Sequence, residues 1–501
     1  MRLFEILLFF SSVFLLAIPF IFNQRIRRSA LLLTSGAGSI FLVIHLLVEG
    51  YRVQLLFLYG FTILMLMLSI IDVFITQKAV RTTSRIRRVL GPLLIVIGLI
   101  ATACLNYVFP VFDLPAPTGK LKVGMQVFHF VDPNREETFG KTATGKRELM
   151  VQVWYPTEAG TGEYAPFIPD TRILSYMGEN FGLPGFTFQH LRYVSSHSYS
   201  GGEVSSEQAS YPLILANPGN VSSRFLHTSQ AENLASHGYI VAVIDHTYNT
   251  FATKFPDGRI TTSTTDNLFS PDHDYQTGRG VRDKLGKVLT EDVAFALDQF
   301  DLIQSGQIPS HLKGRIDLGH VGVFGHSIGG ATAYDASYDP RITVGIDLDG
   351  GLYRLREREG LRKPFLFINS ESYSEKLKRV MDNRVYTDAE LNLMGSTREW
   401  EDQVTEDKKL ELERMRETVD EGGQVLYIDN TEHLNFADVQ FISSIFNMLG
   451  ITGKIAPERA NSVINAYMLD FFNMYLKNQG GNLMKGPDSR FPEVKFVNWL
   501  L

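Results

Sequence analysis

Ser327 is the residue of this chain whose surroundings most clearly indicate chemistry. It lies in segment 325–330, Gly-His-Ser-Ile-Gly-Gly, directly after the apolar run Val321–Phe324 and before small residues that suit a helix. This order of strand, G-x-S-x-G and helix is the layout of a nucleophile elbow, a sharp turn that exposes a serine hydroxyl. Such a turn has no room for large side chains two residues to either side, a demand that Gly325 and Gly329 meet. The motif is short enough to arise by chance among 42 glycines, so the flanking elements carry the prediction.

A serine hydroxyl needs a neighbouring base, and on an elbow of this kind the acid and the histidine follow later in the chain. His433 is the only histidine after Ser327, and it comes just beyond the apolar run Val425–Ile428, which predicts a strand. Its loop should emerge at the carboxyl edge of the sheet, where the serine also emerges. We expect His433 to be the base; the alternative is an exposed loop histidine without a catalytic role.

Three carboxylates follow predicted strands between this serine and this histidine, namely Asp347, Asp349 and Glu371. Asp347 lies inside the apolar run that forms its strand. Asp349 comes at the carboxyl end of that run, before two glycines, where its side chain can turn towards the site. We therefore predict Asp349 as the acid, with Glu371, one strand later, as the alternative.

Short apolar runs alternate with stretches of helical character from residue 211 onwards. The alternation indicates right-handed crossovers between parallel strands, and hence an α/β architecture. An earlier segment, 149–155, alternates in hydrophobicity and predicts a half-buried, antiparallel strand. The other predicted strands are Pro212–Ala216, Tyr239–Ile244, Val321–Phe324, Ile342–Leu348, Pro364–Ile368 and Val425–Ile428, and representative helices are Phe225–His237, Lys284–Gln304 and Asn461–Leu476.

The first 110 residues hold four apolar runs, each close to the ~20 residues with which a helix crosses a bilayer core. They are roughly 3–22, 29–48, 53–76 and 89–110. We interpret them as four transmembrane helices. A cleaved signal peptide is the alternative for the first run, but its apolar core is long, its basic flank is short and no small-residue cleavage site precedes Asn23.

Positive charges between these runs predict the orientation of the bundle. Because cytoplasmic loops carry the excess of lysine and arginine, the loops after the first and third runs should face the cytoplasm. Residues after 110 then lie outside the cell, which predicts a multi-pass protein of the cell membrane with an extracytoplasmic catalytic domain. The basic residues concerned are Arg25, Arg27, Arg28, Lys78, Arg81, Arg85, Arg87 and Arg88.

The predicted domains are a membrane domain, 1–112, a linker, 113–120, and an α/β domain, 121–501. Two prolines in the linker forbid helix continuation and favour an extended spacer. Two stretches of the α/β domain interrupt its alternating pattern, about 157–208 and 372–422. Insertions at the catalytic rim of such sheets commonly shape the substrate entrance, so both are candidates for a lid.

Composition excludes several other kinds of protein. Residues 1–110 carry ten Lys and Arg against three Asp and Glu, which leaves 38 against 51 in the remainder, a net charge of −13 that repels nucleic acid. The single cysteine, Cys104, lies in the fourth apolar run, so the outer domain has neither a disulfide framework nor a thiol nucleophile. The sequence has no G-x-G-x-x-G or H-E-x-x-H motif, and we expect neither a cofactor nor a metal.

Several segments together resemble the secreted and bacterial platelet-activating-factor acetylhydrolases, a calcium-independent phospholipase A2 and esterase branch of the α/β-hydrolase fold. The resemblance covers roughly 121–475, and the order of the segments is far more specific than any one motif. It implies an α/β-hydrolase fold, with a mostly parallel central sheet flanked by helices, and it places the acid at Asp349 rather than Glu371. The segments are Gly325–Gly330, Ile346–Gly350, Phe365–Glu371, His433–Asp438, Leu234–Gly238 and Val151–Pro156.

The same resemblance locates the oxyanion hole, but here the chain departs from the family pattern. The family's loop reads Ser-His-Gly followed by an apolar residue, whereas the matching segment 217–220 reads Asn-Pro-Gly-Asn. Because backbone N–H groups hold a developing oxyanion, those of Ile328 and Asn220 can still serve, although Pro218 changes the loop. His246 matches a family position and is expected to support the site rather than to react.

The sequence thus predicts a membrane-anchored serine hydrolase of carboxylic esters that acts through an acyl-enzyme on Ser327. The resemblance implies short-acyl or phospholipid esters as substrates. A catalytically silent sensor or scaffold with the same fold is the alternative. A transporter is another, because Glu5, His45 and Asp72 lie in the apolar runs, and a peptidase is a closer rival on the same fold.

Overall fold

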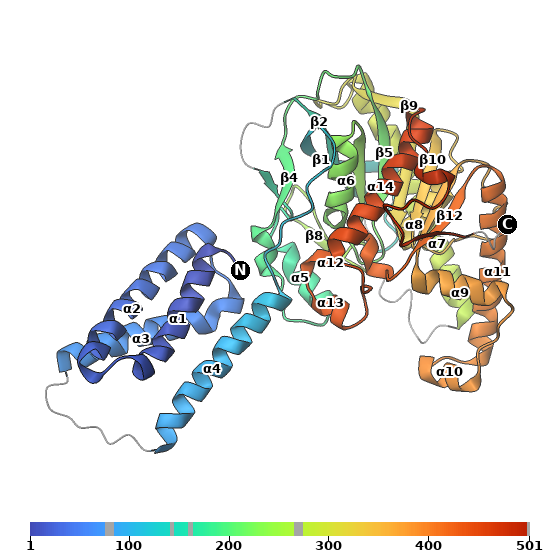
Figure 1. Ribbon diagram of the computed structural model, residues 1–501. Coiled ribbons are helices and arrows are strands. Elements are labelled where there is room, and N and C mark those ends of the chain that lie inside the picture. Colours follow the sequence, from blue (N-terminus) through green and yellow to red (C-terminus); the bar gives the residue numbers. More distant parts are fainter. Residues whose placement is uncertain (76–84, 141–144, 159–163, 265–273, 498–501) are drawn as a thin grey trace.

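A bundle of N-terminal helices and a larger body built on one sheet form the two parts of the molecule (Figure 1). The computed structural model describes residues 1–75, 85–140, 145–158, 164–264 and 274–497. The basic residues at 78 and 81, on which part of the predicted orientation rests, lie outside these ranges.

Four long apolar helices make up the N-terminal part. The π-helical turn η1 (His45–Glu49) extends the second helix, and the 3₁₀ turn η2 (Val53–Leu55) leads into the third. Four spans are long and apolar enough to cross a membrane, in agreement with the four predicted runs. No more than 28% of the most apolar window of any span is buried, as expected of helices surrounded by lipid. The helices are α1 (Leu3–Ile21), α2 (Gln24–Ile44), α3 (Leu56–Ile75) and α4 (Arg85–Val108).

The larger part is organised around an eleven-stranded sheet. Its strand order is β13-β12-β11-β10-β9-β5-β6-β2-β1-β4-β3, and the six neighbours from β12 to β6 are parallel. At the two ends of this parallel block, β13 and β2 run antiparallel to it. The antiparallel direction was predicted for residues 149–155, but the predicted half-burial is wrong, because helices cover both faces of the sheet and all seven residues are buried. The strands are β1 (Lys122–Glu136), β2 (Lys146–Thr157), β3 (Tyr164–Pro166), β4 (Ser195–Ser200), β5 (Tyr211–Asn217), β6 (Ile240–His246), β9 (Ile316–His326), β10 (Ile342–Leu348), β11 (Phe365–Ser370), β12 (Gln424–Ile428) and β13 (Val494–Phe496).

Helices cover both faces of the sheet because its parallel strands are apolar on both sides. Along β5, Leu213 and Leu215 belong to one hydrophobic core, and Ile214 and Ala216 to the other. This is the predicted α/β-hydrolase architecture. The helices over the first core are α7 (Tyr275–Ser305), α8 (Ile328–Ala336) and α11 (Arg398–Asp420); those over the second are α6 (Thr228–Ser236) and α14 (Pro457–Leu476).

The predicted elements of the parallel block are present, although several have different ends. The largest difference is in α7, which begins at Tyr275 instead of the predicted Lys284. Asp274 caps this helix, since its carboxylate accepts the N–H of Thr277 at 2.8 Å. Glycines at 278 and 280 lower the local helix propensity and hide this early start from a reading of the sequence.

The two predicted insertions differ in structure. The first contributes the helix α5 (Ile173–Asn180) and the 3₁₀ turn η3 (Gln189–Tyr193), and its strands β3 and β4 extend the edge of the sheet. The second contributes α9 (Glu371–Met381), α10 (Asp388–Met394) and α11. After β6 the chain forms a separate hairpin, β7 (Ala252–Lys254) and β8 (Ile260–Thr262).

The predicted linker lies against the surface of the larger part. Leu114 is buried, and its carbonyl accepts a hydrogen bond from His197 Nε2 at 2.8 Å. Further along, the N–H of Thr118 donates to Asn233 Oδ1 at 3.0 Å. Residues 113–120 therefore carry no helix, as their two prolines require, but they are held by the domain that follows them.

Candidate active site

The backbone of Ser327 has the strained geometry of a nucleophile elbow. The residue joins β9 to α8 with φ 57° and ψ −124°. A Cβ on Gly325 would lie 2.0 Å from the carbonyl oxygen of Gly329, and a Cβ on Gly329 would lie 1.9 Å from that of Asn217. Both glycines are required because backbone from three segments meets at this turn.

The structure brings the three predicted triad residues into hydrogen-bond contact. His433 opens the 3₁₀ turn η6 (His433–Phe436) after β12, and its Nε2 lies 2.9 Å from Ser327 Oγ. Its Nδ1 lies 2.7 Å from Asp349 Oδ2. Asp349 directly follows β10 and is buried, and its other carboxylate oxygen accepts the N–H of Ser370 at 2.6 Å. A buried carboxylate thus faces a half-exposed imidazole, which in turn faces the serine hydroxyl.

The two other candidate acids do not reach the histidine. Glu371 Oε2 accepts the backbone N–H of Asn430 at 2.6 Å. Asp347 is fully buried beneath the elbow, where its Oδ1 accepts the N–H of Gly350 at 2.8 Å. Burial raises the pKa of Asp347 well above its usual value, which favours the neutral carboxylic acid. Asp349 is therefore the carboxylate that the structure offers to His433.

A second histidine, His326, supports the first. Its Nε2 donates to the carbonyl oxygen of His433 at 2.9 Å, and the two ring centroids are 4.6 Å apart. Burial, together with the neighbouring His433 and His227, holds the pKa of His326 well below its usual value, so this ring is neutral. Sequence reasoning did not find this contact, although His326 stands inside the serine motif.

The residues predicted for the oxyanion hole lie beside Ser327. Ile328 is the first residue of α8, so its N–H has no partner within the helix. On the other side, a Cβ on Gly219 would lie 3.3 Å from Ser327 Cβ, which shows how closely the loop after β5 approaches the serine. Asn220 lines the same cavity as Ser327. That the N–H groups of Ile328 and Asn220 hold the oxyanion stays a prediction.

Two cavities meet at Ser327 and His433. The larger, of about 780 Å³, is a charged cleft between the α7 side of the domain and the second insertion, with Arg282, Lys376 and Lys408 among its lining residues. The smaller, of about 340 Å³, is apolar and lies between α5 and the segment that follows His433. An ester bound at the serine can therefore place a polar portion and an apolar portion in different surroundings.

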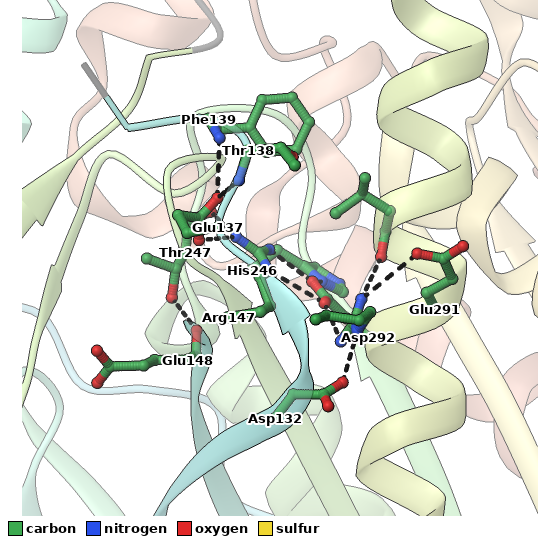
Figure 2. Close-up of polar contacts among 12 residues, drawn as sticks. Asp132, Glu137, Thr138, Phe139, Arg147, Glu148, His246, Thr247, Glu291 and Asp292 are labelled. Carbon is green, nitrogen blue, oxygen red and sulfur yellow. Dashed lines mark hydrogen bonds and ion pairs between the residues drawn. The ribbon is translucent and has the colours of Figure 1, made fainter. Parts of the chain in front are cut away.

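A buried ion network lies next to the predicted support residue His246 (Figure 2). His246 Nδ1 is 2.9 Å from Asp292 Oδ2, and Arg147 Nη2 is 2.6 Å from the same oxygen. Burial alone would raise the pKa of Asp292, but Arg147 and His246 together hold it below its usual value. Within the part of the chain that the structure describes, the side-chain partners of His246 are Asp292 and Asn217 and not Ser327, in line with a supporting role.

Among the described residues, one group has metal-ligand spacing, and it lies in the apolar N-terminal part of the chain. Glu5, His45 and Glu49 have their ligand atoms within 4.8 Å of one another. Arg52 Nη1 lies 3.0 Å from Glu5, and the two nitrogens of His45 contact Glu49 and Tyr59. The carboxylate of Glu5 is thus already paired with Arg52, and both nitrogens of His45 are engaged by neighbouring side chains, which disfavours a metal at this group.

The α/β-hydrolase fold and the contacts among Ser327, His433 and Asp349 are those of a serine hydrolase. The family model of platelet-activating factor acetylhydrolase, isoform II, matches residues 107–491, and the chain belongs to this family. The match leaves out nearly all of the four apolar helices.

Individual relatives have the same class of activity in their names. A probable 1-alkyl-2-acetylglycerophosphocholine esterase from Arthroderma benhamiae is 24% identical over 419 residues, which cover 81% of this chain and 98% of that protein. A platelet-activating factor acetylhydrolase from Cavia porcellus is 27% identical over 374 residues, 68% of this chain and 76% of the relative. Among solved structures, a ferulic acid esterase from Streptomyces cinnamoneus superposes with a TM-score of 0.57 at 26% identity, covering 77% of this chain and 100% of its own.

Proposed function

We propose that this protein hydrolyses lipid esters at the outer surface of the cell membrane, with short-acyl phospholipids as the substrate class. The observation that carries the proposal is the hydrogen-bonded series Ser327, His433 and Asp349 at an elbow between two cavities. The names of the two curated relatives support a phospholipid ester. Four apolar helices support anchoring, with 1–112 as membrane domain, 113–120 as linker and 121–501 as hydrolase domain.

In the proposed mechanism, His433 removes the proton of Ser327 as Oγ attacks the ester carbonyl. Asp349 holds the imidazole in the required tautomer and stabilises the imidazolium that forms. The N–H groups of Ile328 and Asn220 stabilise the tetrahedral oxyanion. His433 then protonates the leaving alcohol, and a water molecule, activated by the same histidine, hydrolyses the acyl-enzyme and restores the serine.

The positive charges at 27 and 28 support a cytoplasmic end of α1 and α2, and hence an extracytoplasmic hydrolase domain. In this orientation the catalytic serine faces the outer leaflet. A membrane transporter role has less support, because Glu5 and His45 are already paired with other side chains of the bundle.

A membrane-impermeant fluorophosphonate probe tests reactivity and orientation together. We expect it to label the protein on intact, sealed cells and to form an adduct at Ser327 that mass spectrometry locates, because an activated serine is the nucleophile that such probes trap. The Ser327→Ala variant is the control that must not be labelled. Labelling only after lysis would show that the hydrolase domain faces the cytoplasm. No labelling before or after lysis would favour the alternative of a catalytically silent sensor or scaffold.

A further inference from the structure

The apolar cavity at Ser327 belongs to the side of the hydrolase domain that rests on the membrane helices. Its walls include Met177 of α5, Leu226 and Phe251, and, after His433, the residues Ala437 and Val439. Met177, Leu226, Phe251 and Val439 are members of one hydrophobic cluster, against which Phe109, Val111 and Phe112, the residues just after α4, are packed. The pocket and the end of a membrane helix therefore share a continuous apolar core.

Direct contacts hold this side of the domain to the bundle. The segment after His433 forms α12 (Val439–Ile442) and α13 (Ile445–Met448), and between them Ser443 Oγ donates to the carbonyl of Val108 at 2.6 Å. From the first insertion, Tyr193 OH donates to the carbonyl of Tyr51 at 2.8 Å. Figure 1 shows α5, α12 and α13 at the end of the body that adjoins α4. The segment that follows the catalytic His433 is thus in direct contact with the membrane domain.

Exposed apolar side chains mark the same side. Met448 and Leu449, at the end of α13, are 72% and 65% exposed, and Phe186 of the first insertion is 56% exposed. Their chain neighbours contact the bundle: Ser444 Oγ donates to the carbonyl of Tyr107 at 3.3 Å, and the carbonyl of Thr187 accepts from Gln54. Large apolar side chains next to the ends of spanning helices favour the membrane interface over water.

We infer that the apolar pocket binds an aliphatic chain of an ester that resides in the outer leaflet, so that the substrate reaches Ser327 from the bilayer. The inference rests on the proposed function and narrows its substrate to membrane-resident lipid esters. The opposite cleft, with Arg282, Lys376 and Lys408, then receives the polar remainder of the molecule. The shared requirement is an aliphatic chain, carried on either the acyl or the alcohol side of the ester.

Chain-length series on the full protein in vesicles test the pocket. One series varies the acyl chain at constant alcohol, and the other varies the alcohol at constant acetyl group. Ala437→Phe fills the pocket, and we expect it to lower the ratio of kcat/KM for ten-carbon over two-carbon chains by about tenfold in one of the two series, because buried methylene groups lose their contacts. The series that responds identifies the side of the ester that enters the pocket.

Two further variants make the result decisive. Val439→Ala truncates the pocket wall without any clash, and we expect about a threefold fall of the same ratio. Ala389→Phe, an exposed position on α10, is the matched control and leaves the ratio unchanged. If both Ala437→Phe and Val439→Ala hydrolyse esters with unchanged ratios, the pocket does not bind the aliphatic chain, while the proposed function still holds. If the wild-type protein hydrolyses none of these esters, the proposed function itself is wrong.

Whether the substrate enters from the bilayer is tested with the wild-type protein reconstituted in vesicles that contain a long-chain ester. If the ester comes from the bilayer, the rate follows its mole fraction in the membrane at a fixed amount of vesicles, and it does not change when the suspension is diluted. A rate that follows the bulk concentration of monomeric ester would overturn delivery from the membrane.

A different observation concerns the start of the oxyanion loop. Asn217, the last residue of β5, donates from Nδ2 to the carbonyl of Phe324 at 3.2 Å, which fixes the orientation of its amide. Its Oδ1 therefore faces His246 Nε2, at 3.1 Å. The other ring nitrogen of His246 faces the carboxylate of Asp292. Both ring nitrogens of His246 are therefore held by oxygen atoms of neighbouring side chains.

Charged side chains surround these contacts of His246. Asp292 also accepts from Arg147 and lies 2.8 Å from Arg135 Nη2. Arg147 Nη1 contacts Glu137 Oε2 at 2.8 Å, and Arg135 Nε contacts Asp132 Oδ2 at 2.6 Å. Two arginines, at 135 and 147, thus meet three carboxylates, at 132, 137 and 292, and a fourth carboxylate, that of Glu291, lies 3.7 Å from Arg135 at the exposed edge of the network (Figure 2). Pairing of the buried charges offsets part of the cost of removing them from water.

We propose that His246 and Asn217 are positioning residues that hold the oxyanion loop against Ser327. Asn217 is followed directly by Pro218, Gly219 and Asn220, and its own carbonyl packs on Gly329 in the first turn of α8. A change in the Asn217 side chain therefore moves the N–H of Asn220 relative to the serine. Such a shift raises the energy of the transition state more than that of the bound ester, because the negative charge on the carbonyl oxygen develops only as the tetrahedral intermediate forms.

Steady-state kinetics per active site, counted by fluorophosphonate titration, test this role. We expect His246→Ala and Asn217→Ala each to lower kcat about tenfold with KM changed less than about twofold, as loss of oxyanion stabilisation requires. The double variant should cost no more than the larger single effect, because both act through one chain of contacts. Glu291→Gln, at the exposed edge of the network, is the control. A fall in titratable sites with normal kcat per site would show a purely structural role and overturn the proposal.

Discussion

Replacing Ser327 with alanine is expected to lower kcat/KM for esters by about 10⁴-fold or more, the largest effect of any single change in the chain. The reason is that His433 then has no hydroxyl to deprotonate, and water must attack the ester without covalent help. Thermal unfolding should differ little from wild type, because alanine keeps the Cβ and removes only a hydroxyl. The measurement is steady-state hydrolysis of a chromogenic acetyl ester by the full-length protein.

Ser372 provides a matched serine in the same surroundings. It lines the charged cleft, and its Oγ donates to Glu432 Oε2 at 2.6 Å without touching His433. We expect Ser372→Ala to retain activity within about threefold, because its hydroxyl contacts Glu432 and Ser370 rather than His433 or Asp349. Wild-type rates in the Ser327→Ala protein would exclude this serine as the nucleophile.

The second large effect is expected at the acid. Asp349→Asn should lower kcat about 10³- to 10⁴-fold, because an amide facing Nδ1 favours the wrong tautomer of His433 and no longer stabilises the imidazolium. Size and shape are preserved, so the loss should appear in kcat rather than in the amount of folded protein. The measurement is kcat per titrated site at several pH values.

Two isosteric changes at the rejected acids complete this experiment. Glu371→Gln keeps an oxygen for the N–H of Asn430, and Asp347→Asn replaces a carboxyl whose raised pKa already favours its neutral form. We expect both to stay within a few-fold of wild type, about 1 kcal/mol or less in transition-state stabilisation. A severe loss in Glu371→Gln with an active Asp349→Asn would move the acid one strand along the sheet.

The sequence predicted the parts of the site that depend on local geometry or on strand order. Ser327 is marked by glycines that its own turn requires, and Asp349 and His433 follow strands whose carboxyl ends share one edge of the sheet. These signals need no knowledge of which side chains touch. Their spatial meeting in the structure follows from the parallel block, although the catalytic role of each residue stays a prediction for the variants above to test.

Other features could not be predicted because they depend on contacts between distant segments. The hydrogen bond from His326 to the carbonyl of His433 joins the end of β9 to the turn η6 after β12, and nothing in the serine motif requires it. The partner of His246 is Asp292, on a helix whose beginning the sequence analysis missed. The edge strands β3 and β4 are short and irregular in composition, so an insertion was predicted where the sheet in fact continues.

The segment between the bundle and the body has a consequence for motion. Phe112 packs on Phe441 with ring centroids 6.0 Å apart, Leu114 is buried, and Thr118 is hydrogen-bonded to Asn233. A segment held by contacts at three successive points cannot act as a flexible hinge between the bundle and the body. The hydrolase body should therefore rotate with the anchor about the bilayer normal, at the slow speed set by membrane viscosity. Fluorescence anisotropy of a dye on the body would then decay over microseconds instead of the nanoseconds of free tumbling.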